Sequence, residues 1–202
     1  MVSKTAIIVL AAGESARMGT PKQLLPIRDT RLLNYCMRAF REVKVDTVVL
    51  VLGAMGSQIQ DQLEDTDVTV VHNENWAKGM GGSLAIGLKC ALDEHPQLDQ
   101  VLISLGDLPL LDEAHYKMLL EAARVQTQAI VATRYATTGG VPVLFKRIYF
   151  DRLLTLDGEM GAKKLLTQYA DDVFWVEAEQ PYADVDTPED YQQILRTLDH
   201  HS

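Results

Sequence analysis

A glycine-bearing loop with two basic side chains follows the first apolar run of the chain. This first loop, residues 10–22, reads Leu-Ala-Ala-Gly-Glu-Ser-Ala-Arg-Met-Gly-Thr-Pro-Lys. Such a turn can present backbone N–H groups to a polyphosphate, to which Arg17 and Lys22 add fixed positive charge. It is not a P-loop, because five residues separate Gly13 from Gly19 and Lys22 comes three residues later. We expect the loop to bind a nucleoside triphosphate, with these candidate contacts: Leu10, Ala11, Ala12, Gly13 and Lys22.

A carboxylate follows directly after a later apolar run. Gly106, Asp107 and Leu108 come soon after residues 100–104, which we expect to form a strand. In open α/β sheets, ligands bind in the crevice at the carboxyl ends of the strands. Mg²⁺ prefers oxygen ligands and typically takes only one or two protein carboxylates, with phosphate and water completing its shell. Asp107 is therefore a predicted metal ligand; the alternative is a turn residue that bonds its own backbone.

A second glycine cluster opens a predicted helix. Residues 75–84 read Asn-Trp-Ala-Lys-Gly-Met-Gly-Gly-Ser-Leu. Helix N-termini offer unpaired N–H donors, and glycines let a ligand approach the backbone closely. Gly79, Gly82 and Ser83 are therefore candidate ligand contacts, with a simple flexible loop as the alternative. Trp76 is expected to pack rather than to stack on a ligand.

Two further carboxylates precede a predicted helix late in the sequence. Residues 184–190 read Asp-Val-Asp-Thr-Pro-Glu-Asp, in which a capping side chain, an early proline and early acidic residues indicate a helix N-terminus. This helix is expected to reach about Leu198. Asp186 is equally well explained as the N-cap, whereas Asp184 lies outside the helix and has no such structural role.

Short β-branched runs alternate with amphipathic stretches between these motifs. The runs are apolar on both faces, as in strands covered by helices on both sides. The expected strands are 5–10, 47–52, 68–71, 100–104, 129–132 and 173–176. The expected helices are 31–41, 57–63, 82–92, 112–124, 148–154 and 162–170, and residues 135–145 are expected to form a loop and a short strand. This alternation predicts an α/β fold with a mostly parallel, doubly wound sheet.

The motifs share a place in this predicted sheet. They follow the first, third, fourth and last expected strands, so in a parallel sheet all of them open on the same edge. No linker or internal repeat divides the 202 residues, and we expect one domain over residues 1–202.

The first loop resembles the signature of the nucleotidyltransferases with a Rossmann-like fold. Its pattern Leu-Ala-Ala-Gly-x-Ser-x-Arg-Met-Gly-x-x-Lys, followed by Leu-Leu-Pro at 24–26, is highly specific. Gly-Asp-x-Pro at 106–109 and the run at 184–190 resemble the metal-binding and closing elements of the same group. The group includes molybdenum cofactor, sugar-phosphate and isoprenoid nucleotidyltransferases. The resemblance implies a single-domain, three-layer Rossmann-like fold of the nucleotide-diphospho-sugar transferase type.

Within that group the sequence is most similar to the molybdenum cofactor cytidylyltransferases, which are MobA-like NTP transferases. Ala12 stands where the guanylyl enzymes have Gly. Residues 140–145 and 157–162 look like the acceptor-side Gly-x-Pro-x-x-Phe and Gly-x-x-Gly-Ala elements. Leu108 departs from the pattern, because related enzymes often have Met or Gln there, and this weakens the acceptor assignment.

The resemblance implies transfer of CMP from CTP to the terminal phosphate of the molybdenum cofactor, with release of pyrophosphate. Mg²⁺, with Mn²⁺ as an alternative, would be held by Asp107 and by Asp184 or Asp186, since members differ in which position carries the ligand. Arg17, Lys22 and Asp107 would be the catalytic residues. The acceptor phosphate is already ionised near pH 7, so positioning and charge neutralisation must do most of the catalysis. The base and ribose would lie near residues 79–83.

The composition narrows the class of partner. The net charge is −9, with 19 Lys and Arg against 28 acidic residues and no basic block, so neither nucleic acid nor a membrane is expected as a partner. No run approaches the roughly 18 apolar residues of a membrane span. Cys36 and Cys90 are predicted to be buried thiols, which suits a cytoplasmic protein. The resemblance adds transient contact with a molybdoenzyme or its chaperone.

Two other functions stay open at this point. One is a cytidylyl- or other nucleotidyltransferase that acts on a sugar or alcohol phosphate, although no sugar-specific insertion is visible. The other is a non-catalytic carrier of a molybdopterin-type cofactor. A carrier would not need Arg17 and Lys22 together with two metal carboxylates, and we therefore favour the enzyme.

Overall fold

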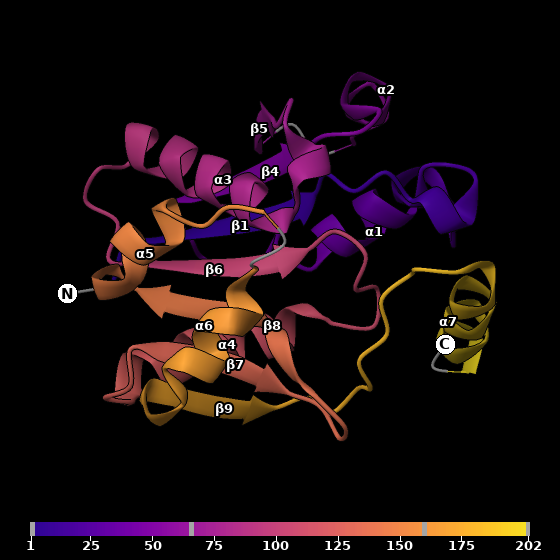
Figure 1. Cartoon of the computed structure of the whole chain (residues 1–202). Coiled ribbons are helices and arrows are strands. Elements are labelled where there is room, and N and C mark those ends of the chain that lie inside the picture. Colours follow the sequence, from indigo (N-terminus) through magenta and orange to yellow (C-terminus); the bar gives the residue numbers. More distant parts are fainter. Residues whose placement is uncertain (1–2, 65–66, 159–160, 201–202) are drawn as a thin grey trace.

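The computed structural model describes residues 3–64, 67–158 and 161–200. Within these ranges seven strands form one sheet in the order β5-β4-β1-β6-β8-β7-β9, with helices on both faces (Figure 1). The strands of this sheet are β1 (Thr5–Ala11), β4 (Thr47–Leu52), β5 (Thr69–His72), β6 (Gln100–Leu105), β7 (Ile130–Arg134), β8 (Gly139–Lys146) and β9 (Val173–Glu177). Two short strands, β2 (Pro26–Ile27) and β3 (Thr30–Arg31), pair separately as an antiparallel hairpin.

The large sheet is mostly parallel, as the sequence predicts. Strand β1 pairs in parallel with β4 and β6, β4 with β5, and β7 with β9. Strand β8 is antiparallel to both of its neighbours, β6 and β7. Two successive reversals leave β7 and β9 pointing the same way as β6. The carboxyl ends of β1, β6 and β9 therefore lie at one edge of the sheet.

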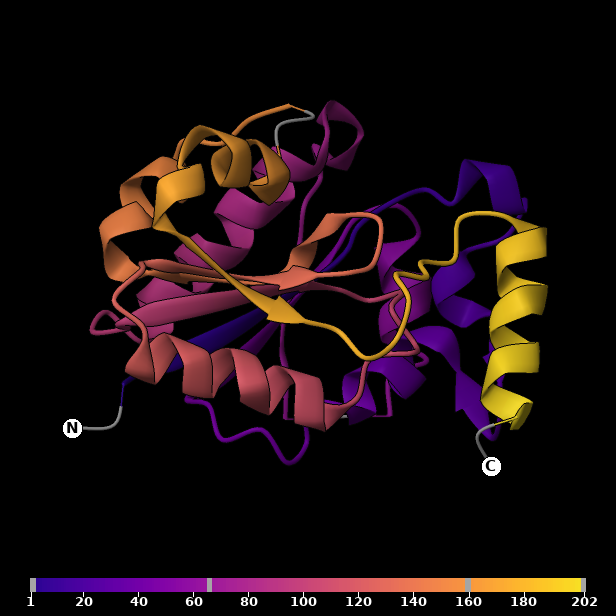
Figure 2. The same cartoon turned by 90° about the horizontal axis from the view of Figure 1, so that it is seen from below.

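Two layers of helices enclose the sheet. Helices α3 (Met80–Glu94), α5 (Phe150–Leu154) and α6 (Ala162–Gln168) pack on one face, and α1 (Leu32–Arg38), α2 (Gly56–Gln60) and α4 (Glu113–Val125) on the other. Figure 2 shows α3, α5 and α6 on one side of the sheet and α4 on the opposite side. Because successive side chains of a strand point to opposite faces, β1 contributes Ile8 to the first core and Ile7 to the second, both fully buried.

The last helix, α7 (Pro188–His200), stands beyond the carboxyl edge of the sheet (Figures 1 and 2). Ile194 packs there in a third apolar cluster with Ile27, Leu32, Cys36 and Val185. The helix begins with a reciprocal cap, in which the N–H of Asp190 donates to Oγ1 of Thr187 at 3.2 Å and the N–H of Thr187 donates to Oδ2 of Asp190 at 2.8 Å. The cap is therefore Thr187, and the N-cap explanation of Asp186 is wrong.

The six expected strands are present, each within two residues of its expected bounds, whereas the loop and short strand expected at 135–145 are wrong in part. Residues 139–146 form a full strand in the interior of the sheet, with Val143, Leu144 and Phe145 completely buried. Pro142 cannot donate a backbone hydrogen bond, and it precedes Val143 where the register with β7 shifts between Ala132 and Thr133. The helices expected at 31–41 and 57–63 are shorter than predicted.

Two smaller expectations are also tested by the fold. Cys36 is buried, while Cys90 is only partly covered, and both are free thiols. Over the three described ranges, no helix has both the length and the apolar character that crossing a bilayer would require.

Candidate active site

A cavity of about 440 Å³ opens at the edge where β1 and β6 end. Its walls come from the first loop, the start of α3, the turn after β6 and the segment between β9 and α7. The predicted site residues on its surface are Leu10, Ala11, Ala12, Gly13, Lys22, Gly79, Ser83, Asp107, Asp184 and Asp186. The convergence predicted from strand order is thus present in the structure.

Two predicted residues do not line the cavity. Gly82 lies in the first turn of α3, where the nearest atom to an added Cβ is Nδ2 of Asn73 at 3.9 Å. Arg17 lies in a short 3₁₀ turn (Ala16–Met18), and its side chain is 68% exposed. It still reaches the site, because its guanidinium donates to Oδ2 of Asp186 at 2.7 Å.

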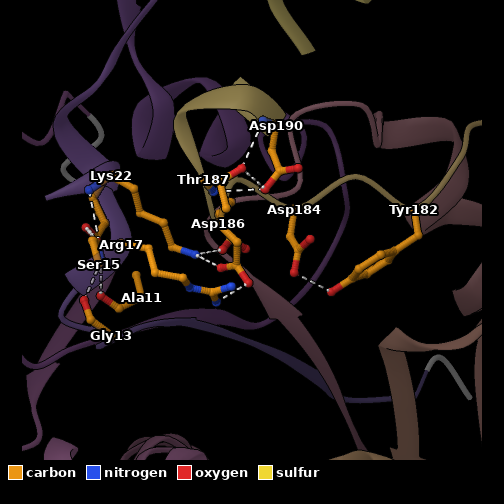
Figure 3. Close-up of polar contacts among 12 residues, drawn as sticks. Ala11, Gly13, Ser15, Arg17, Lys22, Tyr182, Asp184, Asp186, Thr187 and Asp190 are labelled. Atoms are coloured by element: carbon orange, nitrogen blue, oxygen red, sulfur yellow. Dashed lines mark hydrogen bonds and ion pairs between the residues drawn. The ribbon is translucent and has the colours of Figure 1, made fainter. Parts of the chain in front are cut away.

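Lys22 is the central cation of the site. Its ammonium group contacts Oδ2 of Asp107 and donates to Oδ1 of Asp186 at 3.0 Å. Figure 3 shows the Lys22 and Arg17 side chains extending from the first loop toward Asp186. The two carboxylates come from segments far apart in the chain, since Asp107 follows the central strand β6 and Asp186 lies between the edge strand β9 and α7. The first loop is therefore joined electrostatically to two distant segments.

Burial and charge oppose each other in this cluster. Burial raises the pKa of Asp107 above its usual value, and the attraction of Lys22 offsets this only in part. Burial would lower the pKa of Lys22, but Asp107 and Asp186 together raise it. Burial would likewise raise the pKa of Asp186, yet Lys22 and Arg17 hold it below its usual value. Lys22 therefore stays charged at neutral pH, and Asp186 stays ionised.

The donor set fits a hard divalent cation. Oδ1 of Asp107 is buried and has no hydrogen-bond partner in the described part of the chain. A buried oxygen without a partner lowers the stability of the fold unless a ligand binds to it. Asp184 and Asp186 supply further carboxylates to the same cavity. The described residues contain no cluster of three or more His, Cys, Asp or Glu side chains able to cage a metal. Mg²⁺ needs no such cage, since it binds through one or two carboxylates and substrate phosphates.

The two late aspartates differ in their partners. Asp186 engages both oxygens with the cations of Arg17 and Lys22. Oδ2 of Asp184 instead accepts a hydrogen bond from the hydroxyl of Tyr182 at 3.0 Å, as Figure 3 shows. The ring of Tyr182 packs edge-on against Tyr135, with centroids 5.1 Å apart. Tyr182 could not be predicted as a site residue from the sequence, because a tyrosine two residues before a carboxylate carries no recognisable pattern.

Gln23 is a second site residue that the sequence motifs do not predict. It lines the cavity although only 3% of it is exposed, and its amide nitrogen donates to the carbonyls of Ala11 at 2.9 Å and Gly13 at 3.2 Å. A glutamine beside a basic loop has no distinctive spacing, and only the folded loop places its amide under the backbone.

The glycine cluster shapes the opposite wall. Gly79 has φ of 121°, which side chains rarely adopt, and it leads into α3. The hydroxyl of Ser83 is held by Nδ2 of Asn73 at 2.9 Å. An added Cβ at Gly53 would lie 2.6 Å from Cβ of Trp76, so Trp76 packs closely on that backbone as well as lining the cavity.

The structure describes most of the two expected acceptor-side elements, residues 140–145 and 157–162. The N–H of Gly81 donates to the carbonyl of Gly158 at 2.9 Å, which brings the 157–162 segment to the start of α3. Gly161 also lies there, because an added Cβ would be 3.2 Å from the sulfur of Met80. Residues 159 and 160 of this element lie outside the described residues. Residues 140–145 form part of β8 rather than a loop.

Comparison with known proteins adds sequence relatives. The model of the MobA-like NTP transferase domain matches residues 7–173. The bifunctional protein GlmU of a Psychrobacter species is 33% identical over 126 residues, which cover 61% of this chain and 26% of GlmU. The chain thus spans about a quarter of the length of that relative. The purine catabolism protein PucB of Bacillus subtilis is 25% identical over 201 residues, covering 95% of this chain and 96% of PucB.

Solved structures agree with the fold. Rv0371c from Mycobacterium tuberculosis H37Rv has a TM-score of 0.87 and 31% sequence identity, covering 97% of this chain and 99% of that protein. A structure of Rv0371c in complex with manganese has a TM-score of 0.81 and 29% identity, covering 96% and 100% of the two chains. The Rossmann-like architecture expected from the sequence is therefore confirmed.

Proposed function

The chain belongs to the MobA-like NTP transferase family, and from this premise we propose that it is a nucleotidyltransferase that moves a nucleoside monophosphate from an NTP to a phosphate-bearing small molecule. One observation carries the proposal. The first loop with Lys22 and the buried carboxylate of Asp107 face the same cavity, which combines phosphate-binding charge with a metal-binding oxygen.

The chain's own residues can do most of what this reaction requires. Lys22 and Arg17 offset negative charge on the transferred and departing phosphates, and pyrophosphate leaves. An ionised acceptor phosphate needs no strong base, so holding donor and acceptor in line is the main task of the protein. The cavity walls exclude much of the surrounding water from Asp107, which strengthens every charge interaction there.

The carboxylates that face the cavity fit Mg²⁺ or Mn²⁺. Asp107 and Asp184 are the proposed ligands, because each has an oxygen that no cation among the described residues contacts, whereas both oxygens of Asp186 are paired. When bound to Asp107 and Asp184, such an ion would neutralise negative charge on the phosphates of donor and acceptor. The structurally similar Rv0371c forms a manganese complex, which supports the proposal of a divalent ion here.

The finer proposal is transfer of CMP from CTP to the molybdenum cofactor in the cytoplasm. Its support is Ala12, which lines the cavity, together with the sequence resemblance to the cytidylyl branch. A sugar or alcohol phosphate is the alternative acceptor, and a silent cofactor carrier is the alternative class. Contact with a molybdoenzyme or its chaperone would follow only from the cofactor assignment.

A pyrophosphate-release assay tests these proposals together. The protein is given CTP, GTP, ATP or UTP with Mg²⁺ and each of three acceptors, the molybdenum cofactor, a sugar phosphate and an alcohol phosphate. We expect CTP with the cofactor to react, EDTA to stop the reaction, and Asp107→Asn to lower turnover by at least about 100-fold. Asp151→Asn, at an exposed position of α5, is the control and should react like the parent. Cofactor binding without pyrophosphate release under every condition would favour the carrier.

A further inference from the structure

The backbone carbonyls at the start of the first loop all have partners within the protein. Gly106 N–H donates to Leu10 at 3.0 Å, and Ala54 N–H donates to Ala12 at 3.1 Å. Nε2 of Gln23 donates to the two remaining carbonyls, those of Ala11 and Gly13. Four consecutive acceptors, residues 10–13, are therefore fixed by the fold before any ligand arrives.

Gln23 sets the direction of two of these peptide groups. In a trans peptide the C=O and the following N–H point opposite ways, so anchoring the carbonyls of Ala11 and Gly13 also orients the N–H groups of Ala12 and Glu14. The carbonyls of residues 11 and 13 converge on one nitrogen of Gln23, so both following N–H groups point away from that amide. Ala12 and Glu14 both line the cavity.

Gln23 also links the loop to the residue that carries its charge. The hydroxyl of Ser15 donates to Oε1 of Gln23 at 3.4 Å and accepts from the backbone N–H of Lys22 at 3.1 Å. Figure 3 shows Ala11, Gly13 and Ser15 gathered beside the backbone of Lys22. One buried amide thus holds the start of the loop and, through Ser15, the base of the Lys22 side chain.

We infer that Gln23 is a positioning residue for nucleotide binding. It donates hydrogen bonds to the carbonyls of Ala11 and Gly13, so that the first loop presents backbone N–H donors to the triphosphate. This inference rests on the proposed function and deepens it. An anion is repelled by carbonyl oxygens and attracted by N–H groups, so a loop free to rotate its peptides would lose affinity. A carboxamide suits the role, because its single NH₂ group carries two protons and can serve two carbonyls.

The test compares two variants at Gln23 with a matched control. Gln23→Leu removes the amide at similar volume, and Gln23→Glu keeps the shape but replaces the donor with an acceptor. Gln100→Leu is the control, since Gln100 is also buried and donates through Nε2, to Thr5 Oγ1 at 2.9 Å, but lies at the start of β6, away from the cavity. Thermal unfolding of each protein reports whether the fold is kept.

Affinity for CTP, GTP, ATP and UTP with Mg²⁺ is then measured by calorimetry without acceptor. We expect both Gln23 variants to bind the preferred NTP at least about tenfold more weakly than the parent, with KM for that NTP rising more than kcat falls, while Gln100→Leu binds normally. Folded Gln23 variants with parental affinity would overturn the inference and leave the proposed function intact. A parent that binds none of the four NTPs would instead overturn the proposed function.

Discussion

The ammonium group of Lys22 contacts the carboxylate of Asp107, and the two side chains are only 15% and 12% exposed. A buried ion pair of this kind is more informative about function than about stability, because desolvation cancels much of its attraction. Here the lysine lies against the carboxylate that the reaction would offer to a metal. We therefore expect Lys22 to compete with a divalent cation for Asp107 when no nucleotide is bound.

Replacing Lys22 should have opposite effects on metal affinity and on turnover. We expect Lys22→Ala to bind Mn²⁺ more tightly than the parent in the absence of nucleotide, because the competing cation is gone. The same change should lower kcat/KM by roughly 100-fold or more, since one preorganised charge is lost from the transition state. Spin-resonance titration of Mn²⁺ gives the first quantity and pyrophosphate release the second.

Lys117→Ala is the control for this pair of measurements, because Lys117 forms an exposed ion pair with Glu113 on α4. It should change neither quantity. Weaker Mn²⁺ binding by Lys22→Ala would show that the lysine supports the metal site rather than competing with it.

The two late aspartates should respond differently to neutralisation. Asp184→Asn is expected to weaken Mn²⁺ binding, whereas Asp186→Asn should chiefly raise KM for the NTP, because Asp186 holds Arg17 and Lys22. Tyr182→Phe should reproduce the Asp184 effect in milder form, since it removes the hydroxyl that orients Asp184. Manganese titration and steady-state kinetics on the three variants give the comparison. The reverse pattern would assign the metal to Asp186.

Ala12 should control the choice of base. Ala12 lines the cavity, and we expect its methyl group to leave less room for a purine than a glycine would. We expect the parent to prefer CTP and Ala12→Gly to shift kcat/KM toward GTP by about tenfold, which is the scale of discrimination that shape alone provides. Initial rates with each NTP measure the shift. A parent that prefers GTP would place the chain in the guanylyl branch.

His115 should make stability depend on pH. Burial lowers the pKa of this side chain, whose Nε2 lies 2.9 Å from Oγ1 of Thr133. Between the lowered value and about 6.5, the unfolded chain binds a proton that the folded chain resists, so stability falls as the pH drops below about 6.5. His115→Gln should reduce the loss of Tm between pH 7.5 and pH 5.5. His72→Gln, at an exposed position, should keep the parental response.

The sequence predicts the sheet well because burial leaves a local signature. Strands such as β1 and β6 are short apolar runs, and a motif follows each of them directly, so the edge where Asp107 and Lys22 meet could be foreseen. For strand β8 only a short strand could be expected, because Gly139, Gly140 and Pro142 are typical of turns. Its place between β6 and β7 depends on long-range pairing that no local pattern encodes.

The site residues that the sequence did not predict were missed for a different reason. Gln23 donates hydrogen bonds to two backbone carbonyls, and Tyr182 donates one to a carboxylate; these partners are brought near by the fold or by a bend in the chain. Thr187 rather than Asp186 caps α7, a choice between adjacent residues that sequence preference alone does not resolve. The spacing of residues in the sequence identifies the charged groups of the site, whereas the residues that hydrogen-bond to them and orient them are identified only in the folded structure.

The contacts of Asp186 determine the order in which the site forms during synthesis of the chain. Lys22 and Asp186 are 164 residues apart in sequence, so the ribosome delivers the two cations of the first loop long before their shared carboxylate. At typical rates of synthesis the interval lasts roughly 10 to 30 s, and most of the sheet can form within it. During that time the loop is already basic but lacks Asp184 and Asp186. If the proposed site is correct, a nascent chain attracts polyphosphate before it can carry out transfer, and transfer becomes possible only when the 184–186 segment docks.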